Sequence, residues 1–222
     1  MFSELSAQKK MPENLPKYDY APYHFGFIIG LNSMNFVVKP IKEFNQQDTI
    51  KAVSSQAEMG FDIGIVTNLR IGEHFDLRFI PTLAFGERTM LFTRTLHDTI
   101  YFDTKKKVES TYLDFPLELK FKSRRLYNSR AYVLVGVKYS IDMASQANKK
   151  AADDEIRIKL KKNDYSFEAG VGFDFYTTHF KFGTELKMAY GIRDLLVHES
   201  NIYAQSMDRL NSKIFQFTFT FE

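Results

Sequence analysis

The sequence contains no cysteine, and this absence excludes several kinds of site. Without thiols there is no disulfide framework, no thiolate metal ligand and no cysteine nucleophile. Tryptophan is also absent. The formal net charge of +3 is small for 222 residues, so the composition lacks the basic signature of a nucleic-acid-binding protein.

A long apolar run is missing as well. A membrane-spanning helix needs about 20 consecutive apolar residues, and the chain has no such run. The mean hydropathy is −0.30 in spite of 22 phenylalanines and 12 tyrosines. With this hydropathy, a membrane protein requires apolar residues dispersed by alternation along strands.

That alternation is clearest at the end of the sequence, in residues 213–222. Phenylalanine occupies every second position from Phe215 to Phe221, with Gln or Thr between them. This is the period of a β-strand with one apolar and one polar face, and an amphipathic helix does not produce it. We therefore expect the two faces of this strand to meet different environments.

The same period recurs along the chain, so the fold class is predicted to be all-β in one large domain. Short turns alternate with long polar connections, which are expected at 39–54, around Arg94 to Lys107, at 146–162 and at 192–211. The eight predicted strands are 23–38, 58–71, 75–86, 112–121, 133–141, 165–176, 180–190 and 213–222.

Glycine indicates which face points inward. Alternation alone fits both a lipocalin-like barrel, which is apolar inside, and a membrane barrel, which is apolar outside. Of 11 glycines, all but Gly72 lie on the polar face. An eight-stranded barrel is just wide enough for side chains to fill, so its inner face needs small residues. We predict an eight-stranded antiparallel up-and-down transmembrane β-barrel with a plugged polar lumen over residues 23–222.

The polar face carries charges of both signs. An unpaired buried charge costs several kcal/mol, so we expect the lumen to hold a cross-strand ionic network. Its expected acidic members are Glu58, Asp62, Asp114, Glu118, Glu168, Asp174 and Glu185, and its basic members are Arg70, Arg78, Lys120, Lys138, Lys181 and Lys187.

Two further expectations follow from the barrel. An even strand count puts both termini on one side, which in outer-membrane barrels is the periplasmic side with the short turns, so the long loops are expected to be extracellular. Aromatic residues toward the strand ends are expected to form the interfacial girdles. These residues are Tyr23, Phe92, Tyr112, Tyr139, Tyr176 and Tyr190.

Two neighbouring strands resemble a known family. Residues 112–121 (YLDFPLELKF), followed by 131–137 (AYVLVGV), are similar to the paired central strands of the small outer-membrane β-barrel superfamily of Bacteroidetes. The length, the proline-rich N-terminal segment and the closing strand resemble the PorT (SprT) family. The closing strand also resembles the C-terminal signal that marks outer-membrane barrels for insertion, although Glu222 follows the aromatic residue here.

The resemblance implies a non-enzymatic component of the type IX secretion system, which exports proteins with C-terminal targeting domains and supports gliding motility in some genera. It implies contacts with outer-membrane lipid, lipopolysaccharide and other secretion-system proteins, and no nucleic acid. Two alternatives stay open at this point, a lipid-modifying enzyme and a small solute pore. The oligomeric state is left open.

Residues 1–22 are expected to precede the barrel. Leu5-Ser6-Ala7-Gln8 resembles the cleavage end of a Bacteroidetes signal sequence, with an ordinary tail as the alternative. Residues 9–22 carry Pro12, Pro16 and Pro22 among charged residues. Prolines in this setting predict an extended periplasmic tail outside the fold.

Candidate chemistry is sparse, and no catalytic, cofactor-binding or metal-binding residue is predicted. His198-Glu199-Ser200 has the residue types of a hydrolase, but adjacent residues cannot converge as a triad. The 5 histidines are scattered without metal-ligand spacing.

Three other features have structural or surface interpretations. Asp153-Asp154-Glu155 is interpreted as a solvated acidic loop and not as a cation site. Lys159, Lys161 and Lys162 are candidates for contacts with lipopolysaccharide phosphates. Pro116 lies on the inner face of a strand that must pair on both sides, which predicts a bulge there.

Overall fold

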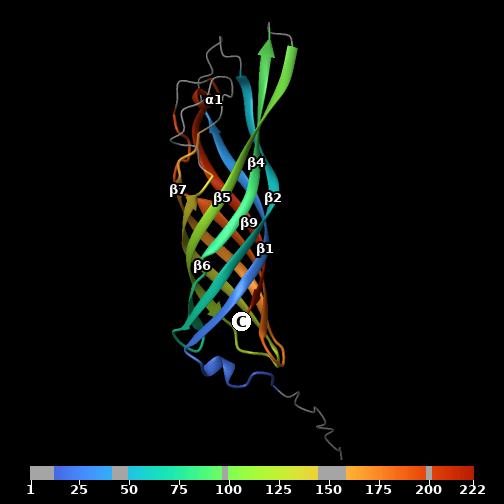
Figure 1. The fold of residues 1–222 in the computed structure, drawn as a ribbon, viewed down its shortest axis with the longest axis vertical. Helices are drawn as coiled ribbons and strands as arrows, with labels where there is room; N and C mark the ends of the chain where they lie inside the picture. Colours follow the sequence, from blue (N-terminus) through green and yellow to red (C-terminus); the bar gives the residue numbers. More distant parts are fainter. Residues whose placement is uncertain (1–12, 42–49, 97–99, 145–158, 199–201) are drawn as a thin grey trace, which may run out of the picture.

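The fold is a closed antiparallel β-barrel (Figure 1). The computed structural model describes residues 13–41, 50–96, 100–144, 159–198 and 202–222. Within these ranges, two short helices accompany the strands, the 3-10 helix η1 (Tyr18–Tyr20) and α1 (Ile202–Gln205). The strands are β1 (Tyr23–Pro40), β2 (Ile50–Arg70), β3 (Phe75–Phe79), β4 (Thr82–Leu96), β5 (Ile100–Lys122), β6 (Ser129–Asp142), β7 (Asn163–Tyr176), β8 (Lys181–Gly191) and β9 (Met207–Phe221).

The ring closes through β1, which pairs with β2 on one side and with β9 on the other. The strands β3 and β4 share the same two neighbours, β2 and β5. Their register against β5 continues without a shift from Phe79↔Leu117 to Thr82↔Asp114. The two are therefore one barrel strand interrupted at Ile80 and Pro81, and the 9 strands fill eight positions in the ring.

The bulge predicted at Pro116 is not present in β5; the irregularity is this interruption in the neighbouring strand. The register between β5 and β6 runs through Pro116↔Lys138 without a shift, so that prediction is wrong. The irregularity lies on the other side of β5, where the register places Ile80 and Pro81 opposite Pro116 and Phe115. Because two prolines that lack N–H groups meet there, the ladder between β5 and its neighbour is interrupted.

The prediction of an apolar outer face is confirmed. Phe27, Val135 and Phe217 are 51%, 57% and 43% exposed, whereas residues of opposite parity are buried.

Glycine is required where backbones approach closely on the inner face. A Cβ at Gly136 would lie 2.5 Å from the carbonyl oxygen of Leu117. No helix among the described residues is long and apolar enough to cross a membrane.

The lumen is polar over only part of its length. Toward the end of the barrel that carries α1, the interior is filled by an apolar cluster from β1, β2, β4, β9 and the segments before β7 and β9. The prediction of a plugged polar lumen is wrong in polarity at this end, because the inward positions near the long loops are apolar. The cluster contains Phe36, Ile50, Met90, Phe92, Leu160, Leu195, Leu196, Ala204, Met207 and Leu210.

Three of the six expected girdle residues belong to the interior. Phe92, Tyr112 and Tyr176 are 0%, 3% and 3% exposed, because their even positions place them on the inner face. Tyr23 and Tyr190 are on the outer face as expected. Tyr139 also points outward, half-buried and close to the ring of Tyr165.

Several strands are longer than predicted. The stretch from Arg94 to Lys107, expected to be a polar loop, belongs largely to the β4–β5 hairpin, and β2 begins at Ile50 within the connection expected at 39–54. The ladder between β1 and β2 ends at Met34↔Glu58, next to a register shift between β2 and β4 at Ala57 to Phe61. Beyond that bulge, β2, β4 and β5 continue as a sheet that projects past the other strands (Figure 1).

Candidate functional site: the short-turn end and the lumen

The short-turn end of the barrel carries the turns after β2, β5 and β7, and the long-loop end is the opposite one. At the short-turn end, residues 13–22 form a tail segment that crosses the barrel opening (Figure 1). The prediction that this segment is extended and outside the fold is wrong, since it forms η1 and hydrogen-bonds to the barrel. Asn14 donates from its side chain to the Tyr176 carbonyl at 2.9 Å and from its backbone to Asn128 Oδ1 at 2.8 Å.

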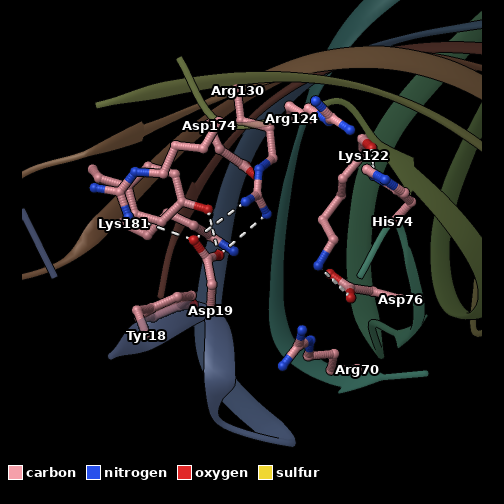
Figure 2. Close-up of polar contacts among 12 residues, drawn as sticks. Tyr18, Asp19, Arg70, His74, Asp76, Lys122, Arg124, Arg130, Asp174 and Lys181 are labelled. Atoms are coloured by element: carbon pink, nitrogen blue, oxygen red, sulfur yellow. Dashed lines mark hydrogen bonds and ion pairs between the residues drawn. The ribbon is translucent and has the colours of Figure 1, made fainter. Parts of the chain in front are cut away.

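Asp19 is the main anchor of the tail segment (Figure 2). The Arg130 guanidinium donates to both of its carboxylate oxygens, at 3.1 and 3.2 Å, and the Tyr176 hydroxyl donates at 2.8 Å. Arg125 lies 3.5 Å from the same carboxylate. Burial opposes ionisation of Asp19, but Arg130, the Tyr176 hydrogen bond and Arg125 outweigh it, so the pKa of Asp19 is lowered from its ordinary value.

Tyr18 lies beside Asp19 and points toward the barrel interior. Its ring stacks on His24 with 4.0 Å between centroids, and the Lys181 ammonium lies 4.9 Å from the ring centroid. Its hydroxyl donates to Glu222 Oε2 at 3.1 Å. Burial raises the pKa of Tyr18 above its ordinary value, so the group acts as a neutral donor.

Glu222, the last residue of the sequence, was absent from the predicted network. Its carboxylate is fully buried, 2.9 Å from Lys181 Nζ and 4.0 Å from Arg78 Nη2. Burial disfavours its charge, but Lys181 and Arg78 hold the pKa of Glu222 far below its usual range. The sequence carried one signal for this position, since Glu222 has the same parity as the inward Thr218 and Thr220.

The predicted ionic network is confirmed in the polar part of the lumen. Arg78 pairs with Glu185, and Lys120 Nζ lies 2.8 Å from Asp174. All of the side chains concerned are nearly or fully buried. Two further lysines each bridge strands, Lys187 to Glu118 at 2.9 Å and Lys138 to Asp114 and Glu168 at 3.2 and 3.1 Å.

Some predicted members of the network have other partners. Asp62 accepts hydrogen bonds from the amides of Asn32 at 2.6 Å and Gln216 at 2.8 Å. Glu58 accepts from the Thr89 hydroxyl at 3.0 Å, and Arg70 donates to the Gly72 carbonyl at 3.2 Å. The prediction named many of the inward charges, but parity does not specify which neighbour each one meets. It missed several buried charged residues, among them Asp76, Arg88, Lys122, Asp142 and Asp164.

Arg88 marks the boundary between the two parts of the lumen. Its side chain is fully buried and hydrogen-bonds to the hydroxyl groups of Tyr112 and Ser110. The guanidinium lies 4.3 Å from the ring centroid of Phe36 and 5.0 Å from that of Tyr112. Aromatic faces stabilise a cation at such distances, so Arg88 is accommodated between the charged network and the apolar cluster.

The long-loop end is filled by the segment that precedes β9. Leu195 and Leu196 are buried in the apolar cluster, and Asp194 Oδ1 accepts from the backbone N–H groups of Leu196 and Leu210 at 3.1 and 3.0 Å. Lys161, a candidate for lipopolysaccharide contact, lies 3.6 Å from the Asp194 carboxylate. These contacts fix the segment inside the barrel.

The other candidate residues do not form a reaction centre in the described part of the chain. His198 is exposed, whereas Glu199 and Ser200 lie outside the described residues, as do Asp153-Asp154-Glu155 and Leu5-Ser6-Ala7-Gln8. Lys159 is half-buried and Lys162 is exposed near the long-loop end. The described residues contain no group of three or more metal-ligating side chains. The arrangement is a set of fixed ion pairs that fill a barrel.

Comparisons with known proteins agree with this architecture. A family model described as "Outer membrane protein beta-barrel domain" matches residues 6–197. No curated protein matches the chain.

The chain is similar to several solved structures at low identity. One is the outer membrane protein OprG from Pseudomonas aeruginosa, with a TM-score of 0.48 and 12% identity over 88% of this chain and 93% of that one. Another is Ail of Yersinia pestis, with a TM-score of 0.41 and 10% identity over 90% and 99% of the two chains. Neisserial surface protein A has a TM-score of 0.41 and 8% identity over 87% and 95%.

Proposed function

The chain belongs to the outer membrane protein β-barrel domain family, and on that premise we propose that it is a closed, non-enzymatic barrel that acts through contacts with other proteins. The observation that carries this proposal is the occupied lumen. Charged side chains fill its polar part in mutual pairs, and Leu195 and Leu196 fill its apolar part. A barrel filled in this way presents its surfaces, and not an aqueous channel, to its surroundings.

Planar-bilayer recording tests the closed barrel. The purified protein is expected to insert without discrete conductance steps. A matched variant, Asp19→Asn combined with Tyr18→Phe, loosens only the tail segment and is expected to stay non-conducting, because the paired charges behind it remain. Stable single-channel steps from the unaltered protein would contradict the proposal and favour a solute pore.

The finer proposal is a role in the type IX secretion system. It is supported by the resemblance of residues 112–121 and 131–137 to the PorT (SprT) family. Deletion of the gene is expected to leave proteins with C-terminal targeting domains inside the cell, and reintroduction of the unaltered gene is expected to restore their export. Normal export in the deletion strain would overturn this role.

We also propose that the short-turn end faces the periplasm and the long-loop end faces the exterior, as in other outer-membrane barrels. Because the chain contains no cysteine, a single introduced thiol reports on one position. Lys17 in the tail segment and Lys105 in β5 are both exposed. In intact cells, a membrane-impermeant maleimide is expected to label Lys105→Cys and to leave Lys17→Cys unlabelled until the outer membrane is opened. The opposite pattern would reverse the orientation.

A further inference from the structure

The projecting sheet at the long-loop end has one long strand edge. The ladder between β5 and β6 ends at Tyr112↔Asp142, whereas β5 continues to Ile100. Over that extension β5 pairs with β4 without a register shift, as far as Leu96↔Ile100. Among the described strands, β4 is the only strand that pairs with β5 there. β5 is therefore the outermost described strand of the projecting sheet.

The direction of the backbone groups along this edge follows from one hydrogen bond. The Thr111 carbonyl accepts from the backbone N–H of Met143 at 2.7 Å, so it points away from β4. In a regular antiparallel strand, the N–H and C=O of one residue point to the same side, and this side alternates from residue to residue. Lys105, Lys107 and Glu109 have the parity of Thr111, so their backbone groups also point away from β4.

Two of these three side chains, those of Lys105 and Lys107, carry the charge that suits an acidic partner. Lys105, Lys107 and Glu109 are exposed on the outer surface. The Lys107 side chain is 70% exposed, and its one described ion pair, with Glu87 at 3.4 Å, is solvated. Such surface pairs contribute little and are readily exchanged. Two exposed lysines in alternate positions therefore offer charge on the same edge that offers backbone donors and acceptors.

We propose that the β5 edge at Lys105, Lys107 and Glu109 binds an extended acidic segment of a partner polypeptide, which adds to the projecting sheet as a further strand. Main-chain hydrogen bonds supply the affinity in this mode of recognition, and side chains at alternate positions supply the specificity. Lysine on an exposed edge disfavours pairing with a second copy of the same edge, so the occupant is a different, acidic chain. This inference deepens the proposed function and depends on it for the identity of the partner.

The test uses the full chain in detergent micelles and a fluorescein-labelled peptide of about ten residues that alternates Glu and Thr. Binding is followed by fluorescence anisotropy. The same peptide N-methylated at alternate residues keeps its charge but loses the N–H groups that would pair with β5. It is expected to bind at least about tenfold more weakly, since each intermolecular hydrogen bond contributes about 1 kcal/mol.

A matched pair of variants tests the edge itself. Lys107→Pro removes an N–H that points away from β4, so the ladder with β4 is retained. It is expected to weaken peptide binding about tenfold, whereas Lys107→Ala removes only the charge and is expected to weaken it about twofold to threefold. Unchanged heat modifiability of both variants on gels verifies that the barrel is intact.

Several outcomes would overturn the proposal. Equal binding of the N-methylated peptide would mean that charge alone is recognised, as by lipopolysaccharide phosphates. Equal binding by Lys107→Pro and Lys107→Ala, or no binding of the peptide, would exclude the edge. A dimer that Lys107→Pro dissociates, without peptide binding, would assign the edge to a second copy. Each of these results leaves the export test of the proposed function unaffected, so the two proposals fail separately.

Discussion

The Tyr18 hydroxyl donates a hydrogen bond to Glu222 Oε2 at 3.1 Å, which joins the segment before the first strand to the residue after the last one. Glu222 also pairs with Lys181, and its backbone exchanges hydrogen bonds with that residue at 2.7 and 2.9 Å. The seam between β1 and β9 is therefore held at the short-turn end by side chains as well as by the ladder.

Acidification is expected to release the tail segment. The pKa of Asp19 is lowered from its ordinary 3.8, so its contribution to docking is present above that value and is lost as the pH falls through the lowered value. An environment-sensitive dye on Lys17→Cys is expected to report a docked tail from about pH 8 to about pH 5 and release at more acidic pH. Asp19→Asn is expected to release the tail already at neutral pH. If the dye signal of the Asp19→Asn variant depends on pH in the same way as that of the parent, the transition does not belong to Asp19.

Replacement of a lumen lysine is expected to destabilise the barrel strongly. Lys138→Met leaves the Asp114 and Glu168 carboxylates buried without their cation, which is expected to cost about 3–5 kcal/mol in the free energy of unfolding. Urea titration followed by the heat-dependent gel shift measures this loss. Asp208→Asn is the control, because it removes an exposed pair with Lys39 at 3.4 Å and is expected to change stability by less than about 1 kcal/mol.

A side chain at Gly60 is expected to impair folding. A Cβ there would overlap the Phe85 carbonyl oxygen, which belongs to the neighbouring strand and cannot move independently. Gly60→Ala is therefore expected to lower the yield of heat-modifiable barrel and the midpoint of urea unfolding. Gly72→Ala is the matched control, since a Cβ at Gly72 has nothing within 4 Å; equal behaviour of the two variants would refute the steric argument.

A charge on the outer face is expected to oppose membrane insertion. Phe217 is 43% exposed in the apolar band, and an arginine near the bilayer midplane costs about 2–4 kcal/mol. Phe217→Arg is expected to reduce the amount of folded barrel in the outer membrane fraction, whereas Phe217→Leu is expected to behave like the parent. Normal accumulation of the arginine variant would overturn the assignment of this face to lipid.

The alternating pattern was sufficient to predict the barrel. It identified the positions of the barrel strands and their outward face, and the charges that were named as inward lie on the predicted side because a two-residue period fixes the side of each residue. Partner choice was not predictable in the same way. Asp62 meets two amides where a cation was expected, because the neighbours of an inward residue depend on the shear of the whole barrel.

The sequence did not predict two larger features, the extension of β5 and the docking of the tail segment. The extension of β5 around Lys105 has the polar composition of a loop, and its order comes from pairing with β4 and from Val108 packing on the apolar cluster. Docking of the tail segment depends on Arg130 and Tyr176, more than a hundred residues away from Asp19. Contacts at such separations leave no local signal in a sequence.

The site that binds Asp19 and Tyr18 of the tail segment imposes an order on the assembly of the barrel. Its parts come from β6, from β7 and from Glu222 beyond β9, so it does not exist until β6, β7, β8 and β9 have paired. The tail segment is synthesised before the barrel strands, yet it can take its place only when the ring is complete. Protection of the tail from a protease would thus mark the final step of assembly and distinguish finished barrels from nearly finished ones.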